Sequence, residues 1–335
     1  MDVAVVILNW NGRQMLEKYL PSVLHFTQNP NYFIVVADNG STDGSIRWLH
    51  DNYPQVQIIP FDRNYGFTGG YNRALQQVEA DYYVLLNSDV EVTEGWLDTL
   101  ISFMEDNPDV GVCQPKMLSY SERDRFEYAG AAGGFIDHYG YPFCRGRILK
   151  NIEKDLGQYD EPEEVFWASG ACMVVRSGLY HHLGGLDESF FAHMEEIDFC
   201  WRAKLMGFHV WAVPSAKVYH LGGGALPNNS PRKLYLNYRN NLLMLRKNLP
   251  SKLRWRLITI RKFLDWCSAL VYLVTGKFSY FGAVCKAHRD YFRMRKDVEP
   301  SVFTEENNDI GHYEGSIILK YFLSGGKLTF DRLRF

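Results

Sequence analysis

Residues 3–12 read VAVVILNWNG, an unbroken apolar run that ends in two asparagines and a glycine. Further apolar runs follow it, separated by amphipathic stretches of helical length. The runs are residues 33–37, 56–60 and 82–86, and the stretches are residues 13–24, 45–52 and 71–78. Continuous apolar strands that alternate with helices are typical of a mostly parallel sheet covered on both faces. We therefore predict an α/β fold, with ligands bound past the carboxyl ends of the strands.

Polar side chains follow each of these four runs. The segments are Asn9-Trp10-Asn11-Gly12, residues 38–44 (DNGSTDG), residues 62–66 (DRNYG) and Asn87-Ser88-Asp89. Because parallel strands end at the same edge of a sheet, we expect these segments to lie together and to form the binding site.

The composition is that of a folded protein. The chain has 335 residues, 46% hydrophobic and 15% aromatic, which is enough to bury one large core or two smaller ones and excludes disorder as the main state. The six cysteines include no C-x-x-C pair, so we expect reduced thiols of the cytosol rather than a zinc ribbon or a disulfide framework. The N-terminus has no basic segment before its apolar run, which argues against a signal peptide. No run approaches 18 uncharged apolar residues.

The net charge of −3 is unevenly distributed. Residues 232–296 contain 16 Lys and Arg against only Asp265 and Asp290, a net charge of +14, which leaves −17 for the rest of the chain. A basic segment on an acidic body indicates an anionic partner, such as a membrane or nucleic acid. The character of the sequence changes at Pro231. We therefore predict a first domain of residues 1–230 and a basic helical C-terminal region of residues 231–335.

Two common nucleotide-binding motifs are missing from the sequence. No G-x-G-x-x-G follows the first run and no G-x-x-x-x-G-K-[ST] occurs. The sequence therefore lacks the motifs that would identify a dinucleotide-dependent oxidoreductase or a P-loop ATPase. Asp38 and Asp43 instead flank a turn of small residues, where a carboxylate can accept hydrogen bonds from a base or a ribose. The alternative is an ordinary turn in which Asp43 or Ser41 caps the next helix.

Three further segments have the chemistry of a phosphate or metal site. Asn87-Ser88-Asp89 offers oxygen atoms to Mg²⁺ or Mn²⁺, although Asp89 as a helix cap is the alternative. The glycine-rich residues 64–72 can present backbone N–H groups to a phosphate, or they form a plain turn. His220 precedes the glycines of residues 222–224, and such loops can close over charged substrates, although a lone histidine is usually not a ligand.

Three carboxylates, Glu195, Glu196 and Asp198, lie within an aromatic run. Apolar surroundings raise the pKa of a carboxylate and suit it to take a proton from an alcohol. Helical spacing places Glu195 and Asp198 on one face, with Asp198 four residues before Arg202. We therefore assign Asp198 to a structural salt bridge and keep the two glutamates as candidates for proton transfer.

The motifs in combination strongly resemble the inverting family 2 glycosyltransferases with the GT-A fold, in particular the rhamnosyltransferase-like bacterial members. The resemblance covers about residues 3–247. The matching segments are VAVVILNWNG, VVADNGSTDGS, RNYGFTGGYNRAL, YVLLNSDVEV, SGACMVVR, GGLDESFFAHMEEIDFCWR and VYHLGG. It implies a GT-A first domain that transfers a sugar, rhamnose or another hexose, from a nucleotide diphosphate donor with inversion, using Mg²⁺ or Mn²⁺. The acceptor would be a glycan or a lipid-linked sugar in cell-envelope polysaccharide synthesis.

The resemblance also implies roles for individual residues. Glu196 falls at the catalytic base, preceded by Glu195, and Asp89 falls at the metal ligand, with His220 completing the metal or diphosphate site. The expected nucleotide-sugar-binding residues are Asn9, Asn11, Asp38, Asn39, Asp43, Asn64, Gly66, Asn72, Asn87 and Gly170. Two positions depart from the family. Asn87 replaces the first acid of its D-x-D motif, and Glu196 is longer than the aspartate of its Glu-Asp pair.

Two functions other than sugar transfer are alternatives. A nucleotidyltransferase would have a glycine-rich loop with a basic residue after the first strand, where this chain has residues 9–12. A catalytically inactive nucleotide-sugar-binding subunit of an envelope assembly complex is compatible with the departures at Asn87 and Glu196. The basic, aromatic C-terminal region is expected to dock peripherally on the cytoplasmic face of the cell membrane, with packing on the acidic body or on a partner subunit as the alternative. The resemblance gives nucleic acid no role, and the sequence does not indicate an oligomeric state.

Overall fold

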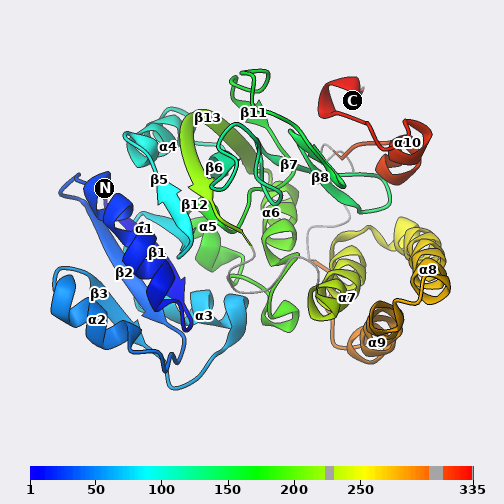
Figure 1. Ribbon diagram of the computed structural model, residues 1–335, viewed down its shortest axis with the longest axis horizontal. Coiled ribbons are helices and arrows are strands. Elements are labelled where there is room, and N and C mark those ends of the chain that lie inside the picture. Colours follow the sequence, from blue (N-terminus) through cyan, green and yellow to red (C-terminus); the bar gives the residue numbers. More distant parts are fainter. Residues whose placement is uncertain (223–229, 302–311, 334) are drawn as a thin grey trace.

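The structure, a computed structural model, describes residues 1–222, 230–301, 312–333 and 335 (Figure 1). Its first half contains β1 (Val3–Asn9), α1 (Arg13–His25), β2 (Tyr32–Asp38), α2 (Ser45–Asn52), β3 (Gln57–Pro60), α3 (Gly66–Leu75), β4 (Tyr82–Asn87), β5 (Val90–Val92), α4 (Trp96–Asp106), β6 (Val110–Ser119), β7 (Gly134–Ile136), β8 (Pro142–Cys144), β9 (Arg147–Ile148), β10 (Asn151–Ile152) and β11 (Glu163–Glu164). It continues with β12 (Cys172–Arg176), α5 (Ser177–His182), η1 (Glu188–Phe190), α6 (Glu195–Leu205), β13 (His209–His220), α7 (Pro231–Asn248), α8 (Ser251–Val274), α9 (Phe278–Met294), α10 (Ile317–Leu323) and η2 (Phe330–Arg332).

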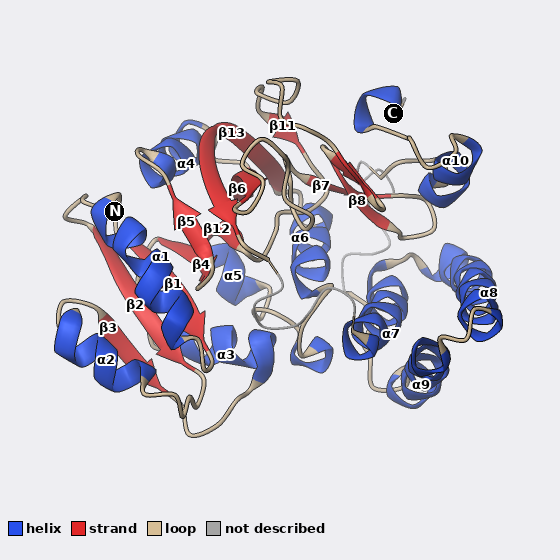
Figure 2. Cartoon of the chain, in the orientation of Figure 1, coloured by secondary structure: helices blue, strands red, loops and turns tan. Residues whose placement is uncertain are grey.

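A nine-stranded sheet forms the centre of the molecule, with helices on both sides (Figure 2). The strand order is β11-β13-β6-β12-β4-β1-β2-β3, and β5 pairs with β13. Strands β1 to β4 are mutually parallel, whereas β12 runs antiparallel between β4 and β6. The carboxyl ends of β1, β2 and β4 therefore share one edge. The predicted α/β fold with a mostly parallel sheet is confirmed.

Side-chain alternation in β1 explains why its sequence is apolar throughout. Val3, Val5 and Ile7 pack under α1 and α4, whereas Ala4 and Val6 belong to a second core on the side of α3 and α6. Both faces of the strand are thus covered, and each alternate residue is removed from water. Because β1 is held on both faces, the polar residues that follow it are held at its carboxyl end.

Helices α7, α8 and α9 pack side by side at one edge of the molecule, and a small antiparallel sheet of order β10-β9-β8-β7 lies near them (Figure 1). The predicted helical character of the C-terminal region is confirmed, and α7 begins at Pro231, where the character of the sequence changes. The expectation of unpaired cysteines is also met, since all six are free thiols. Among the described residues, no helix combines the length and apolarity needed to cross a membrane. The division at residues 230 and 231 stays a prediction.

Candidate active site

The ends of β1 and β2 are joined by a buried hydrogen-bond network. Nδ2 of Asn9 donates to Oδ2 of Asp38 at 2.8 Å and to Oγ of Ser41 at 3.2 Å. The other carboxylate oxygen of Asp38 accepts from the backbone N–H of Ser41 at 2.8 Å. Because Asn9 and Asp38 are fully buried, these bonds fix the 38–41 turn at the edge of the sheet.

Asn11 and Asp43 complete this turn from its exposed side. Oδ1 of Asn11 accepts from the N–H of Thr42 at 2.8 Å. The carboxylate of Asp43 accepts from the N–H of Arg13 at 2.8 Å and from the N–H of Ser45, at the start of α2, at 3.1 Å. Asp43 therefore links the start of α1 to the start of α2, which is the contact expected if it caps the turn before α2. Asn11 lies at the edge of the hydrogen-bond network.

Asn39 connects β2 to the turn that opens α3. Its Nδ2 donates to Oδ1 of Asn64 at 3.1 Å and to the carbonyl oxygen of Gly66 at 2.9 Å. Gly66 has a positive φ of 77°, and a Cβ there would lie 2.6 Å from the ring of Phe191. A side chain at residue 66 would thus clash with the loop that precedes α6. The structure brings Asn39, Asn64 and Gly66 together at the predicted strand ends.

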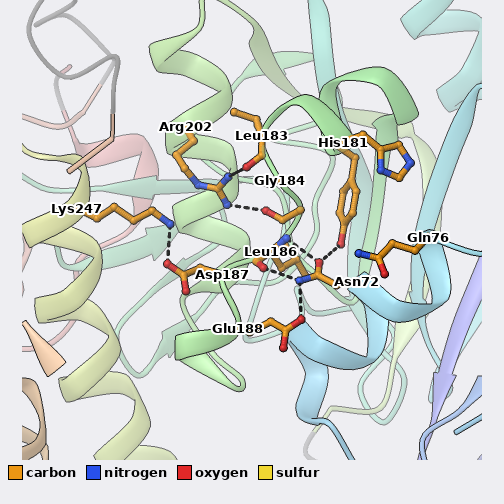
Figure 3. A pocket seen from close by; sticks show the side chains of 12 residues that line it. Asn72, Gln76, His181, Leu183, Gly184, Leu186, Asp187, Glu188, Arg202 and Lys247 are labelled. Atoms are coloured by element: carbon orange, nitrogen blue, oxygen red, sulfur yellow. Dashed lines mark hydrogen bonds and ion pairs between the residues drawn. The ribbon is translucent and has the colours of Figure 1, made fainter. Parts of the chain in front are cut away.

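Asn72 lies elsewhere, although it was grouped with these residues. Its Oδ1 accepts from the hydroxyl of Tyr180 at 2.7 Å, and its Nδ2 donates to the carbonyl oxygen of Leu186 at 2.8 Å. Figure 3 shows Asn72 in the wall of a polar cavity of about 490 Å³, beside Leu186 and Glu188. Neither Asp89 nor Glu196 lines this cavity. The contacts of Asn72 are those of a residue that anchors the 183–188 loop.

Asp89, after β4, meets His220, the last residue of β13. Oδ1 of Asp89 lies 3.1 Å from Nε2 of His220, and Nδ1 of His220 lies 3.4 Å from Oε1 of Glu127. All three side chains are buried. Burial opposes a charge on the imidazole, but the two carboxylates outweigh it and raise the pKa of His220 to about 10. Burial likewise opposes ionisation of Asp89, yet the hydrogen bond from His220 holds the pKa of Asp89 below its usual value.

Of the expected metal residues, Asp89 has the chemistry of a ligand to a cation that substrate completes, whereas the protonated ring of His220 has no lone pair to offer a metal. Within the described ranges, no group of three or more His, Cys, Asp and Glu side chains has the arrangement of a metal cage. Mg²⁺ is commonly held by one or two carboxylates together with substrate phosphates, so Asp89 suffices as the protein anchor. Both ring nitrogens of His220 lie beside carboxylates, Nε2 beside Asp89 and Nδ1 beside Glu127, so the charged ring compensates the negative charge at this end of the site.

The two candidate bases begin α6. Glu195 is buried and Glu196 is half-buried, and Oε2 of each lacks a hydrogen-bond partner. Burial, and next the charge of Glu196, raise the pKa of Glu195 well above its usual range. Burial raises the pKa of Glu196 to about 7, against the opposing effects of backbone N–H groups and the positive charge of Lys233. Glu196 is therefore poised to exchange a proton near neutral pH.

A glycine turn lies between Glu196 and the tip after β4. A Cβ on Gly170 would lie 3.7 Å from Cβ of Glu196 and 3.2 Å from the ring of Phe67. The next residue, Ala171, accepts a hydrogen bond of 2.9 Å at its carbonyl oxygen from the N–H of Asn87. Through this turn, the structure brings the expected base, Gly170 and the 87–89 segment into one neighbourhood.

Asp198 has the structural role that its spacing predicted. Its carboxylate accepts from Nε of Arg202 at 2.8 Å, from Nδ2 of Asn248 at 2.7 Å and from Nζ of Lys247 at 3.0 Å. The predicted salt bridge to Arg202 is confirmed. Since Lys247 and Asn248 belong to α7, Asp198 also joins α6 to the C-terminal helices.

The turn before α6 is strained and is held from α7. Phe191, His193 and Met194 all have positive φ, between 64° and 74°, which side chains other than glycine rarely adopt. Nδ2 of Asn240, a fully buried residue of α7, lies 2.7 to 3.0 Å from the carbonyl oxygens of Phe190, Ala192 and His193. Asn240, from the C-terminal region, therefore stabilises the backbone turn that leads into Glu196.

The sequence alone did not identify Glu127 or Lys233. Lys233 lies in the first turn of α7, and the charges of Glu127 and Glu196 both act on its pKa, although burial is the larger effect and lowers it. Lys233 is therefore close enough to both Glu127 and Glu196 for their charges to act on it. No spacing in the sequence indicates this, because the three charged groups come from segments about 40 to 100 residues apart.

Comparisons with known proteins identify the family and the fold. The sequence model of the family described as "Glycosyl transferase family 2" matches residues 4–184, more than half of the chain. N-acetylglucosaminyl-diphospho-decaprenol L-rhamnosyltransferase of Mycobacterium tuberculosis is 28% identical over 234 residues, which cover 64% of this chain and 75% of that protein. The dTDP-rhamnosyl transferase RfbF of Shigella flexneri is 23% identical over 261 residues, which cover 74% and 81% of the two chains.

Solved structures share the fold at low sequence identity. S. aureus TarS 1-349 in complex with UDP-GlcNAc has a TM-score of 0.56 and 15% identity, with 89% of this chain and 84% of that chain covered. The mannosyltransferase PcManGT from Pyrobaculum calidifontis, in complex with GDP-Man and Mn²⁺, has a TM-score of 0.53 and 12% identity, with 87% and 86% covered. These likenesses concern the fold.

Proposed function

The chain belongs to glycosyl transferase family 2, and from this premise we propose that it is an inverting, metal-dependent transferase acting in cell-envelope polysaccharide synthesis. It moves rhamnose or another hexose from a nucleotide diphosphate to a lipid-linked or glycan acceptor. The observation that carries the proposal is Glu196, whose pKa is raised to about 7 beside Gly170 and the 87–89 segment. The names of the M. tuberculosis and S. flexneri relatives support rhamnose as the sugar.

Glu196 takes the proton of the acceptor hydroxyl as that oxygen attacks the anomeric carbon. The new glycosidic C–O bond forms while the bond from the anomeric carbon to the diphosphate oxygen breaks, and the proton ends on the carboxylate. A single displacement of this kind inverts the anomeric configuration and needs no carboxylate nucleophile. Glu195 is buried and its pKa is raised well above the usual range, so it remains protonated and positions the start of α6.

The donor's diphosphate faces the charged residues at the other side of the Gly170 turn. Asp89 is the protein ligand proposed for Mg²⁺ or Mn²⁺, which when bound neutralises charge on the departing diphosphate. His220 and Lys233 contribute positive charge to the same neighbourhood. The Asn9, Asp38 and Asn39 network shapes the wall proposed to receive the nucleoside.

A lipid-linked acceptor is part of the proposal. The name of the M. tuberculosis relative specifies an acceptor sugar carried on decaprenol diphosphate, which supports an acceptor of this chemical class. Such a molecule is held in a membrane, so we place the enzyme peripherally on the inner face of the cell membrane. The net charge of +14 in residues 232–296 supports this location.

A turnover experiment tests the proposal directly. The protein is incubated with dTDP-rhamnose, UDP-GlcNAc or GDP-mannose, a diphospho-polyprenol-linked N-acetylglucosamine and Mg²⁺ or Mn²⁺. We expect release of nucleoside diphosphate and one added sugar by mass spectrometry, with inverted anomeric configuration by NMR. Donor binding without nucleotide release from any donor would instead identify a catalytically inactive nucleotide-sugar-binding subunit.

A further inference from the structure

One face of α8 is apolar and exposed to solvent along the length of the helix. Trp255 is 79% exposed, Phe263 67% and Val274 73%, and Trp266 and Leu270 are also exposed. These five residues, which we call the α8 stripe, follow one another at spacings of eight, three, four and four residues. Such spacings keep them within an arc of about 100° on one side of a helix.

The opposite face of α8 shows why the stripe is not an unfinished core. Leu257, Ile258 and Ala269 are buried against the rest of the molecule. Arg261 and Asp265 are buried as well, and they form an ion pair of 2.9 Å between Nε and Oδ1. One face of α8 is thus packed against the rest of the molecule, and the apolar side chains of the stripe remain exposed on the other face. Contiguous exposed apolar surface of this kind marks an interaction site.

The charges around the stripe select its partner. Lys252 and Arg256 are exposed on the same arc, and Lys277 is exposed just beyond the end of the helix. The single acidic residue of α8, Asp265, faces inward, so no carboxylate lies on the exposed face of this helix, which the structure describes throughout. A second copy of the chain that packed stripe against stripe would present the same positive charges and be repelled. Aromatic and aliphatic side chains bordered by Lys and Arg match the interface of an anionic bilayer.

The stripe lies on a helix that is connected to, and packed beside, the helix that contacts the candidate active site. A two-residue link joins α7 to α8, and the two helices run side by side, with the hydroxyl oxygens of Tyr238 and Ser268 2.6 Å apart (Figure 1). Because the chain reverses direction between the two helices, Val274 lies near the level of Lys233, five residues before Tyr238. The stripe therefore lies on a helix that packs against α7, whose Asn240 and Lys247 contact the turn before α6 and Asp198 of α6.

We propose that the α8 stripe inserts into the interfacial layer of an anionic lipid bilayer and so brings the active site to the level of a lipid-linked acceptor. This inference rests on the proposed function for its purpose, but its physical basis is independent of catalysis. The side chains enter the boundary between headgroups and acyl chains, while Lys252, Arg256 and Lys277 contact anionic headgroups.

Vesicle co-sedimentation tests the proposal with the full chain. The vesicles are pure phosphatidylcholine or a 7:3 mixture with phosphatidylglycerol, at 0.1 and 0.5 M NaCl. We expect binding to the anionic vesicles that weakens with salt. The W255S/F263S/W266S variant should lose about tenfold or more in partition coefficient, and K252E/R256E should lose about fivefold per residue at low salt, from ~1 kcal/mol for each basic group. Leu156→Ser, at a residue 82% exposed outside the helical region, is the matched control and should bind like wild type.

Two further readouts make the result decisive. The melting temperature, and its increase on adding UDP-GlcNAc or dTDP-rhamnose with Mn²⁺, should be equal in wild type and variants, so that a failure of the transferase proposal is seen separately from a failure of docking. Wild-type protein that stays in solution under all lipid and salt conditions would overturn the proposal. So would a concentration-dependent dimer in analytical ultracentrifugation that the triple variant abolishes, because the stripe would then be a protein interface.

Discussion

Nδ2 of Asn240 lies 2.7 Å from the carbonyl oxygen of His193, three residues before the proposed base Glu196. The amide comes from α7, and the carbonyl belongs to the turn whose backbone has positive φ at Phe191, His193 and Met194. Strain of this kind persists only where surrounding contacts over-determine the backbone. Helix α7 therefore holds the turn that precedes the proposed base, in addition to packing against the proposed membrane surface of α8.

Asn240→Ala should lower kcat by about tenfold or more while the KM for the donor changes little. The variant leaves carbonyl oxygens of the 190–193 turn without their donor, which also costs about 1–3 kcal/mol of stability. Asn241→Ala is the matched control. Its neighbouring amide is equally buried and donates to the carbonyl oxygen of Gly140 at 2.7 Å, away from the turn. Steady-state kinetics and denaturant unfolding of both variants separate positioning from stability, and equal loss of kcat in the two would refute the positioning role.

Glu196→Gln should abolish transfer and leave donor affinity nearly intact, because the base acts on the acceptor hydroxyl. The expected loss of kcat is about 10²-fold or more, the usual contribution of a positioned base. Glu195→Gln should retain most of the activity, since burial keeps the Glu195 carboxyl protonated and Gln preserves its shape. Single-turnover kinetics with saturating donor gives the comparison. An inactive Glu195→Gln beside an active Glu196→Gln would reverse the assignment.

The rate of transfer should depend on pH through Glu196. The carboxylate accepts the proton only when ionised, so with a pKa of about 7 the value of kcat/KM should fall about tenfold per pH unit below that point. Glu196→Gln should lose this acid limb together with its activity. A flat profile from pH 5 to 8 in the wild type would show that another group takes the proton.

Lys233→Met should shift the same acid limb to higher pH. The positive charge of Lys233 favours the ionised form of Glu196, so its removal raises the pKa of Glu196 further above its usual range. Lys252→Met is the control, because Lys252 is exposed at the start of α8. The pH–rate profiles of the two variants give the measurement, and an unmoved limb in Lys233→Met would separate that lysine from the base.

The fold was largely predictable because its strands carry strong local signals. The apolar run that opens the sequence forms β1 over Val3–Asn9, and the helical spacing expected of Glu195 and Asp198 is met in α6, which begins at Glu195. The strands β7 to β10 were not predicted, since elements of two or three residues are too short to show a period of two.

The site was predictable where its residues follow a strand, and not where they meet from distant segments. Asp38 and Asn39 lie at the expected edge. Asn72 does not, because α3 begins at Gly66 and carries Asn72 nearly two turns away from the strand ends. Glu127 meets His220 from 93 residues earlier in the chain, and no periodic pattern records such a pairing. From the charge of residues 232–296 we predicted only a surface that binds an anionic partner. That prediction did not include the contact of Asn240 with the turn before Glu196 or the effect of Lys233 on the pKa of Glu196.

Asp89→Ala should remove the metal dependence of donor binding. Asn87 is neutral and Ser88 offers only a hydroxyl, so the variant retains no carboxylate at the tip after β4. We expect the Mn²⁺-dependent part of the affinity for a nucleotide sugar to fall about 100-fold or more, since loss of an outer-shell partner alone costs 10- to 100-fold. Calorimetric titration of dTDP-rhamnose or UDP-GlcNAc, with Mn²⁺ and with EDTA, measures this part directly.

Glu91→Ala is the matched control for Asp89→Ala. Glu91 is an acid of the adjacent strand β5 whose carboxylate pairs with Arg123 at 2.7 Å, so its loss removes one negative charge from the same region without touching His220. It should keep the wild-type difference between Mn²⁺ and EDTA. Because Asp89 also supports the charge on His220, Asp89→Asn serves as a second variant that preserves the side-chain shape and should behave like Asp89→Ala. Full metal-dependent affinity in both Asp89 variants would mean that the cation is held elsewhere, and the role assigned to Asp89 would be wrong.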